Sequence, residues 1–176
     1  MLSLSDNEFS VISFLVRNFT EKLTIRNFAQ KLNFSPAGVF NILKKLEKQN
    51  IVVGQKLGTG LFYSINFENR IAGHLAEIVL LYSEEKIEKI EIEQIKQAKA
   101  AIFDRKTLLL VTDNVTILNI SIPNVGIIVK TEDEVTALLR KKDAEMLQLL
   151  RKGVVVFGED KIVEIIRRTK NSSIFD

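Results

Sequence analysis

Apolar side chains recur every three or four positions along three segments near the start of the chain, which is the spacing of an amphipathic helix. The first helix is predicted to begin at Ser5, because the S-x-x-E pattern of a capping box satisfies two backbone donors there, and to end near residue 18. A second, shorter helix is predicted over residues 25–32, with Thr24 as its N-terminal cap. A third is predicted over residues 36–49. The pattern therefore opens with three consecutive helices.

The third segment carries the strongest start signal, because a serine, Ser35, precedes a proline in the first helical position. Its apolar residues form one stripe, so the opposite side of the helix is expected to face solvent. A helix that enters the DNA major groove needs small residues that permit close approach and polar residues that pair with bases or phosphates. The outward side offers both kinds of residue, namely Ala37, Gly38, Asn41, Lys44, Lys45 and Lys48, and Ser35 at its start can also meet a phosphate or a base.

Two β-rich runs follow within residues 51–66, and the connection Gly58-Thr59-Gly60 between them predicts a hairpin. Asn50 suits the left-handed end of the preceding helix. Three helices and a hairpin complete one unit over residues 1–68. Two side chains at the start of the second helix and three on the hairpin are placed to meet phosphates or the minor groove: Thr24, Arg26, Gln55, Lys56 and Thr59.

Helical spacing returns after Asn69, where five apolar residues predict one face of a helix that ends near Ser83: Ile71, Leu75, Ile78, Val79 and Tyr82. A stretch rich in Glu and Lys follows and is expected to continue as helix to about Ala100. Its spacing slips midway, so a kink, a break or a short strand is also open there. Residues 69–97 are interpreted as linker or dimerisation helices.

The last third alternates strand-like and helix-like patterns, which predicts a small α/β domain over residues 98–176. A second capping box, Thr131 with Glu134, starts one helix, and Asp143 caps another. A final helix is expected over about residues 160–169. Strands are expected over residues 107–112, 115–120, 125–130 and 154–157. The whole chain is thus expected to belong to the α+β class.

The composition fits a folded protein and removes several kinds of chemistry. The chain has 176 residues, of which 46% are hydrophobic and 27% charged. No run approaches the roughly 20 apolar residues of a membrane helix, and the first residues lack a secretory signal, so a cytoplasmic protein without membrane contact is expected. With no cysteine and one histidine, His74, the chain excludes disulfides, cysteine zinc sites and thiol catalysis. Neither a metal nor a cofactor is expected.

The positive charge is concentrated at the start of the chain. Residues 1–68 hold 8 Lys or Arg against 5 Asp or Glu, whereas the rest of the chain holds 17 of each kind. A basic excess is the sign that a phosphate-binding module needs. The charge therefore agrees with the DNA-facing interpretation of the third helix.

Segments 23–32, 35–39, 43–47 and 50–52 carry a resemblance to a known fold. Through them, nearly all of residues 5–68 resembles the winged helix-turn-helix of bacterial and archaeal transcription regulators. The resemblance implies that helix 36–49 enters the major groove of double-stranded DNA and that hairpin 51–66 acts as the wing. Because such readers commonly bind two half-sites with two-fold symmetry, a homodimer is also expected.

Residues 143–166, which include the run 149–159, resemble the end of a small nucleotidyltransferase-like domain of the kind fused to archaeal winged helices. The resemblance extends over about residues 98–170. An active member needs a Gly-Ser turn followed by two aspartates one residue apart, since the paired carboxylates hold the metal that positions the nucleotide. This chain has neither feature. No catalytic residue is therefore expected, and Asp104 and Asp113 are expected to be turn or surface residues.

Three roles stay open for the second half of the chain: oligomerisation, sensing of a small-molecule effector, and binding of a partner. The sequence identifies no effector. The leading interpretation is a sequence-specific DNA-binding transcriptional regulator. The alternatives are a divergent nucleotidyltransferase-type enzyme and a winged-helix module that binds protein.

Overall fold

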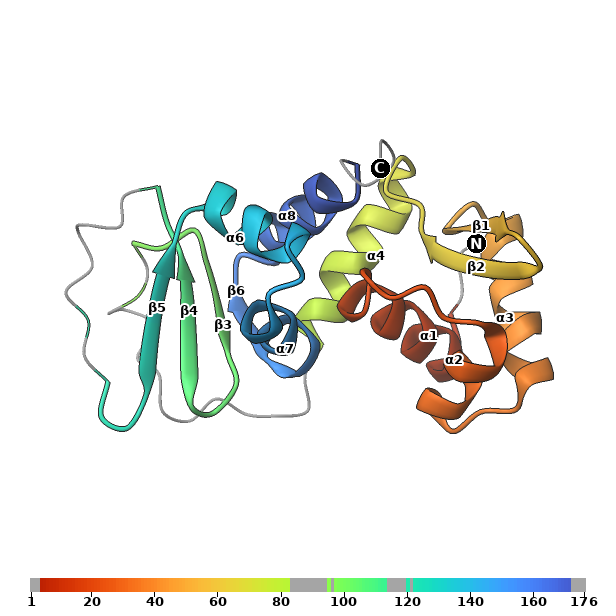
Figure 1. Ribbon diagram of the computed structural model, residues 1–176, viewed down its shortest axis with the longest axis horizontal. Coiled ribbons are helices and arrows are strands. Elements are labelled where there is room, and N and C mark those ends of the chain that lie inside the picture. The colour runs from red at the N-terminus through yellow and green to blue at the C-terminus, as the bar shows by residue number, and fades with distance from the viewer. Residues whose placement is uncertain (1–3, 83–94, 96, 114–119, 121, 172–176) are drawn as a thin grey trace. The chain divides into compact units, whose positions relative to one another are not determined.

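The computed structural model describes residues 4–82, 95, 97–113, 120 and 122–171. Within these ranges the chain forms seven helices and six strands, which belong to one two-stranded and one four-stranded sheet (Figure 1). The expected mixture of helix and sheet is therefore confirmed. The chain divides into two compact units, Met1–Val79 and Leu80–Asp176.

The first unit begins with the three predicted helices, α1 (Asp6–Arg17), α2 (Ile25–Leu32) and α3 (Pro36–Lys48). Each begins at its predicted cap. The hydroxyl oxygens of Ser5, Thr24 and Ser35 each accept a hydrogen bond from the backbone N–H three residues ahead. The local signals in the sequence were therefore sufficient to place all three helix starts.

The three helices pack around one apolar core. α2 ends at Asn33, whose left-handed backbone (φ 56°) turns the chain directly into α3. The ring of Phe28 on α2 meets the ring of Phe14 on α1 edge to face, with centroids 4.7 Å apart. Of the four apolar residues predicted to form the buried stripe of α3, Val39, Leu43 and Leu46 are buried, whereas Ile42 is only partly buried. The burial of this stripe turns the opposite side of α3 toward solvent.

The predicted hairpin is formed by strands β1 (Val52–Leu57) and β2 (Gly60–Ile65), which pair antiparallel. The loop between them has two residues, Gly58 and Thr59, so Gly60 of the predicted connection belongs to β2 instead. Gly58 has a left-handed backbone with φ 57°, which a tight hairpin turn requires and glycine adopts readily. β1 packs against α3 and β2 against α1, so the hairpin is attached to the helices along both strands.

Three asparagines fix the root of the hairpin. Asn50 has a left-handed backbone with φ 60°, as predicted, and ends the turn after α3. The side-chain amide of Asn66 donates to the backbone oxygen of Asn50 at 3.1 Å and to its side-chain oxygen at 2.9 Å. The amide of Asn69 donates to the same backbone oxygen at 2.9 Å. The two ends of the hairpin are thus joined by side chains as well as by the β-ladder.

Helix α4 (Arg70–Leu81) follows the hairpin, but the predicted apolar face is only partly right. Leu75 and Val79 are buried, whereas Ile71, Ile78 and Tyr82 are at least half exposed. The segment contains two overlapping apolar rows at helical spacing, and the row with two alanines is the buried one because small side chains allow closer packing. The residues of that row are Ala72, Leu75, Ala76, Val79 and Leu80. The predicted end at Ser83 lies outside the described residues.

The second unit contains a four-stranded sheet in the order β5-β4-β3-β6. β3 pairs antiparallel with both β4 and β6, while β4 and β5 are parallel. The strands are β3 (Ala100–Phe103), β4 (Thr107–Val111), β5 (Gly126–Lys130) and β6 (Val154–Phe157). The helices are α6 (Glu132–Arg140), α7 (Ala144–Lys152) and α8 (Glu159–Asn171). α7 and α8 contact β3, and α6 contacts α7 and α8 (Figure 1).

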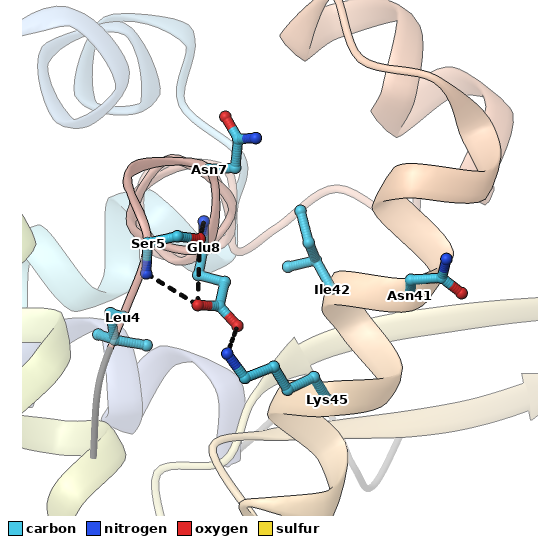
Figure 2. A pocket seen from close by; sticks show the side chains of 7 residues that line it. All are labelled: Leu4, Ser5, Asn7, Glu8, Asn41, Ile42 and Lys45. Carbon is cyan, nitrogen blue, oxygen red and sulfur yellow. Dashed lines mark hydrogen bonds and ion pairs between the residues drawn. The ribbon is translucent and has the colours of Figure 1, made fainter. Parts of the chain in front are cut away.

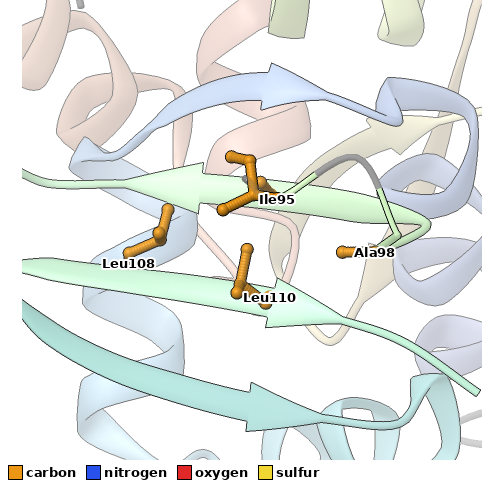
Figure 3. Close-up of a cluster of buried hydrophobic side chains, with 5 residues drawn as sticks. Ile95, Ala98, Leu108 and Leu110 are labelled. Carbon is orange, nitrogen blue, oxygen red and sulfur yellow. The ribbon is translucent and has the colours of Figure 1, made fainter. Parts of the chain in front are cut away.

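The core of the second unit lies on both faces of the sheet, because alternate residues of a strand point to opposite sides. One face holds a cluster of Ile95, Ala98, Ala101, Leu108 and Leu110 (Figure 3). The neighbouring residues of the same strands, Ile102 and Leu109, are also buried. The two central strands therefore have no solvated face, which explains why β4 reads as a continuous apolar run.

One strand of this unit was not predicted. The helix expected to continue to about Ala100 crosses residues 83–94 and 96, which lie outside the described residues, and Ala100 itself begins β3. The two alanines that open β3 are weak strand formers, so local propensity gave no signal there. The strand predicted over 115–120 also falls largely outside the described residues. The other predicted strands and helices of this unit, with both predicted caps, are confirmed.

Candidate nucleic-acid interface

The outward side of α3 is organised as a central row with one charged residue on each flank. Four of the predicted site residues are separated by four, three and four positions and so lie along one line of the helix. This central row consists of Ala37, Asn41, Lys44 and Lys48. Lys45 lies to one side of the row, toward α1, and Glu47 lies to the other side, toward the hairpin. The structure thus brings four predicted residues together and sets Lys45 apart from them.

Lys45 is held by a carboxylate on another helix. Its Nζ lies 2.6 Å from Oε1 of Glu8, whose side chain is only 4% exposed. Oε2 of the same carboxylate accepts hydrogen bonds from the backbone N–H and the hydroxyl of Ser5, at 2.8 and 3.1 Å. Figure 2 shows Lys45 bent toward Glu8 while Asn41 points away from the pair. Lys45 therefore ties α3 to the first turn of α1.

The ionised state of Glu8 favours its contact with Lys45. Burial acts to raise the pKa of its carboxyl, but the hydrogen bonds from Lys45 and from the backbone and hydroxyl of Ser5 outweigh burial and hold the pKa below its ordinary value. Glu8 is therefore ionised at neutral pH, and the pair with Lys45 is a true ion pair.

Lys44 is held by a carboxylate on the other flank. Its Nζ lies 2.8 Å from Oε2 of Glu47 and 5.9 Å from the ring centroid of Phe40. The hydrogen bond to Glu47 raises the pKa of Lys44, so the ammonium stays charged. Oε1 of Glu47 accepts a hydrogen bond from the backbone N–H of Gly54 on β1, at 3.2 Å. Glu47 thus connects α3, Lys44 and the hairpin.

Three of the predicted cations have no ion-pair partner among the described residues. Arg26 on α2, Lys48 on α3 and Lys56 on β1 are exposed. In the part of the chain that the structure describes, none of the three has an ion pair or a side-chain hydrogen bond. A cation without a carboxylate partner can neutralise a phosphate at no electrostatic loss to the protein. These three residues are therefore the strongest phosphate-binding candidates.

The remaining predicted residues are positioned by local structure. Thr24 and Ser35 use their hydroxyl oxygens as caps, which leaves each O–H free to donate outward. Gln55 and Thr59 are exposed on the hairpin. A β-carbon on Gly38 would lie 2.9 Å from the Ser35 hydroxyl oxygen, so glycine suits this first turn of α3.

A cavity of about 420 Å³ opens beside the central row. It lies between the first turn of α1 and the flank of α3, and Figure 2 shows its lining. The lining residues are Leu4, Ser5, Asn7, Glu8, Asn41, Ile42 and Lys45. Among the described residues, the charged groups that line the cavity are those of Glu8 and Lys45.

The carboxylates weighed as metal ligands in the second unit have other contacts. Oδ1 of Asp104 accepts from the backbone N–H of Thr107 at 2.9 Å and so forms the turn between β3 and β4. Asp113 is exposed and pairs with Lys99 at 2.7 Å. Both were expected to be turn or surface residues, and both are. His74 on α4 is exposed and lies 3.1 Å from Glu77.

No three His, Asp or Glu side chains within the described ranges gather closely enough to hold a metal ion. None of the helices formed by these residues has the length and apolar character needed to cross a membrane.

Glu8 and Glu47 are the two residues that sequence reasoning missed as parts of the interface. Glu47 follows Lys44 by three positions, a spacing at which helical side chains meet, so this pair could have been predicted from the sequence. Glu8 was recognised only as part of a capping box. Its contact with Lys45 joins two different helices, and no local pattern reports such a pair.

No protein-family model matches the chain, and no curated protein does either. Among solved structures, the chain is similar to one described as CymR, the global cysteine regulator of B. subtilis. The two are 16% identical, the match covers 53% of this chain and 79% of the other, and the TM-score is 0.32. A likeness at this level carries no argument about fold or function.

Proposed function

We propose that the first unit is a winged helix-turn-helix that binds double-stranded DNA, and that the protein regulates transcription as a homodimer. The observation that carries the proposal is the central row of α3. A serine-capped helix buries one apolar stripe and turns outward a row of one small residue, one amide and two lysines, directly before a hairpin. A helix that reads the major groove requires this distribution.

The reading of bases would fall mainly to Asn41. It lies near the middle of α3, is exposed and points away from the protein (Figure 2). An asparagine amide can pair with adenine through two hydrogen bonds: its nitrogen donates to N7, and its oxygen accepts from the N6 amino group. Ala37, one turn earlier, is small enough to let the backbone of α3 approach the groove.

Phosphate binding would fall mainly to Arg26, Lys48 and Lys56. They lie on α2, α3 and β1, which are the elements that flank the groove in a winged helix-turn-helix. The start of α2 adds backbone N–H groups and the Thr24 hydroxyl, a combination suited to a phosphate. This arrangement would give the interface one base-reading row between separate phosphate contacts.

The test is the salt dependence of DNA binding. Duplexes selected from a random-sequence pool are compared with an unselected duplex of equal length, each over a series of salt concentrations. Lys48→Ala is expected to lower the slope of log affinity against log salt by about 0.9 on both duplexes. Asn41→Ala is expected to lower affinity for the selected duplex only, by a factor of roughly 10.

Lys152→Ala is the matched control, because Lys152 is also an exposed helical lysine but lies on α7 in the second unit. It is expected to leave both slopes unchanged. Selection that enriches no duplex, or binding that does not weaken with salt, would contradict the proposal and favour a winged helix that binds protein.

For the second unit we propose an oligomeric or sensing role without catalysis. Asp104 and Asp113, the carboxylates nearest to the expected nucleotidyltransferase positions, are engaged in a turn and in a surface ion pair. Incubation with labelled nucleotide and magnesium is expected to give no transfer, and transfer would support the enzyme reading. A mass measurement at micromolar concentration tests the homodimer, and a monomer alone would contradict it.

A further inference from the structure

We propose that Glu8 limits the sequence-independent affinity of α3 for DNA, because it withholds Lys45 from the phosphate backbone. The inference rests on the proposed DNA binding by α3 and adds a positioning residue to it. Glu8 lies on α1, outside the helix that would read the bases. It acts through Lys45, which a reading of the sequence places among the DNA contacts.

The first step is geometric. One oxygen of the Glu8 carboxylate faces Lys45 at 2.6 Å, and the other receives both hydrogen bonds from Ser5. Glu8 as a whole is 3% exposed with Lys45 in place, so water has little access to the carboxylate that Lys45 faces. Movement of Lys45 to a phosphate would leave a buried carboxylate without its cation, which is strongly unfavourable. Lys45 is therefore expected to keep its partner when DNA is bound.

The second step concerns the two kinds of DNA contact. Each lysine that neutralises a phosphate strengthens binding to every sequence alike. Asn41, one turn before Lys45, would instead discriminate between bases. Holding Lys45 on Glu8 removes one sequence-independent contact beside the base-reading row and leaves the row itself in place. Affinity for every sequence falls by the same factor as a result, and the ratio of specific to non-specific affinity stays unchanged.

The third step explains why Glu8 holds its lysine more firmly than Glu47 does. Glu47 also pairs with a lysine, Lys44, but that carboxylate is about one-third exposed and its partner lies in the central row itself. Water can replace Lys44 at Glu47, so Lys44 can exchange its partner for a phosphate at little loss. Burial is what makes the Glu8 pair persistent.

The decisive variant is Glu8→Gln. Glutamine can also serve in a capping box, so the start of α1 is kept while the charge that holds Lys45 is removed. The selected duplex and an unselected duplex of equal length are titrated over a salt series. The salt slope is expected to steepen by about 0.9 on both duplexes, since one more lysine reaches a phosphate. Affinity is expected to rise several-fold for both duplexes alike, and discrimination between them is expected to stay unchanged.

The double variant Glu8→Gln with Lys45→Gln assigns the effect to Lys45. It is expected to return the salt slope to that of the natural protein, because the freed lysine is gone. Lys45→Gln alone is expected to leave the slope unchanged. A slope that is smaller by about 0.9 in this single variant would show that Lys45 already contacts a phosphate and would overturn the inference. If Glu8→Gln fails to fold, the salt slope of Lys45→Gln alone still shows whether Lys45 contacts a phosphate.

Glu134→Gln provides the matched control. Glu134 occupies the same position in the capping box of α6, and its replacement changes the net charge by the same amount. It is expected to leave the salt slope and the discrimination unchanged. An unchanged slope in Glu8→Gln, with Asn41-dependent binding intact, contradicts this inference alone. If the natural protein shows no sequence-dependent binding at all, the proposed function is contradicted instead.

Discussion

The capping boxes of α1 and α6 have the same local structure but different surroundings. In both, a hydroxyl oxygen accepts from the third backbone N–H of the helix, and the glutamate at that position returns a bond to the cap. Glu8 is covered by α3 and pairs with Lys45, whereas Glu134 is 46% exposed and pairs with Lys130 at 3.5 Å, four positions away. The motif fixes the helix start in each case, and only burial by a second helix turns the glutamate into a link between helices.

The largest expected difference is in the free energy of unfolding after removal of Lys45 or Lys130. Lys45→Ala leaves the buried Glu8 carboxylate without its cation and is expected to lower the free energy of unfolding by about 2 kcal/mol, less than for a fully buried pair because Lys45 is half exposed. Lys130→Ala is expected to lower it by at most about 0.5 kcal/mol. Urea unfolding followed by circular dichroism measures both. Equal losses would mean that the burial of Glu8 has no energetic weight.

The two cap hydroxyls should differ less. Thr131→Ala removes a helix cap and is expected to lower the free energy of unfolding by about 1 kcal/mol. Ser5→Ala removes a cap and also a hydroxyl that donates to the buried carboxylate at 3.1 Å, so about 1.5 kcal/mol is expected. The same urea experiment compares them. A larger loss in Thr131→Ala would contradict the distinction between the two boxes.

Acid should affect the two glutamates unequally. The folded pKa of Glu8 lies below its ordinary value of 4.5, so its contribution to stability is present above pH 4.5 and is lost as the pH falls through the folded value. Glu134 has a pKa lowered in the same direction, chiefly by its hydrogen bond from the Thr131 backbone, but it faces water.

Urea midpoints measured between about pH 3 and pH 6 should therefore fall less in Glu8→Gln than in the natural protein. Glu134→Gln serves as the comparison, and its midpoints should follow the natural protein more closely. Parallel curves for the natural protein and Glu8→Gln would show that the carboxylate of Glu8 is not linked to folding.

Salt should give the smallest effect. Raising the ionic strength from about 0.1 to 1 M shortens the screening length from about 10 to 3 Å, which weakens exposed pairs far more than buried ones. The destabilisation by Lys130→Ala is expected to vanish at the higher salt, while most of the destabilisation by Lys45→Ala persists. Urea titrations of both variants at the two concentrations test this, and loss of both effects would place the Glu8 pair in contact with solvent.

Much of the first unit could be predicted because its signals are local. A cap hydroxyl, a proline in the first turn of α3 and a glycine in the hairpin each determine the structure of their own neighbourhood. The central row of α3 followed from the buried stripe on its opposite side. Assignment of the lysines was less complete, because the sequence does not distinguish Lys44, Lys45 and Lys48. Among the residues that the structure describes, Lys44 and Lys45 have carboxylate partners and Lys48 has none.

What the sequence could not supply depends on contacts between distant segments. The buried row of α4 was misassigned because two rows satisfy the same spacing, and packing chose the one with Ala72 and Ala76. Ala100 and Ala101 in β3 gave no strand signal, since their place in the sheet comes from pairing with β4 and β6. The Glu8–Lys45 contact has the same character.

Gly54 makes the attachment of the hairpin to α3 depend on the absence of one atom. A β-carbon at this position would lie 2.6 Å from Oε1 of Glu47 and 3.1 Å from Cε1 of Tyr63. An alanine there would displace the Glu47 carboxylate, which accepts from the Gly54 N–H and pairs with Lys44. One substitution on β1 would thus loosen two contacts of α3 at once, although it changes no residue of that helix.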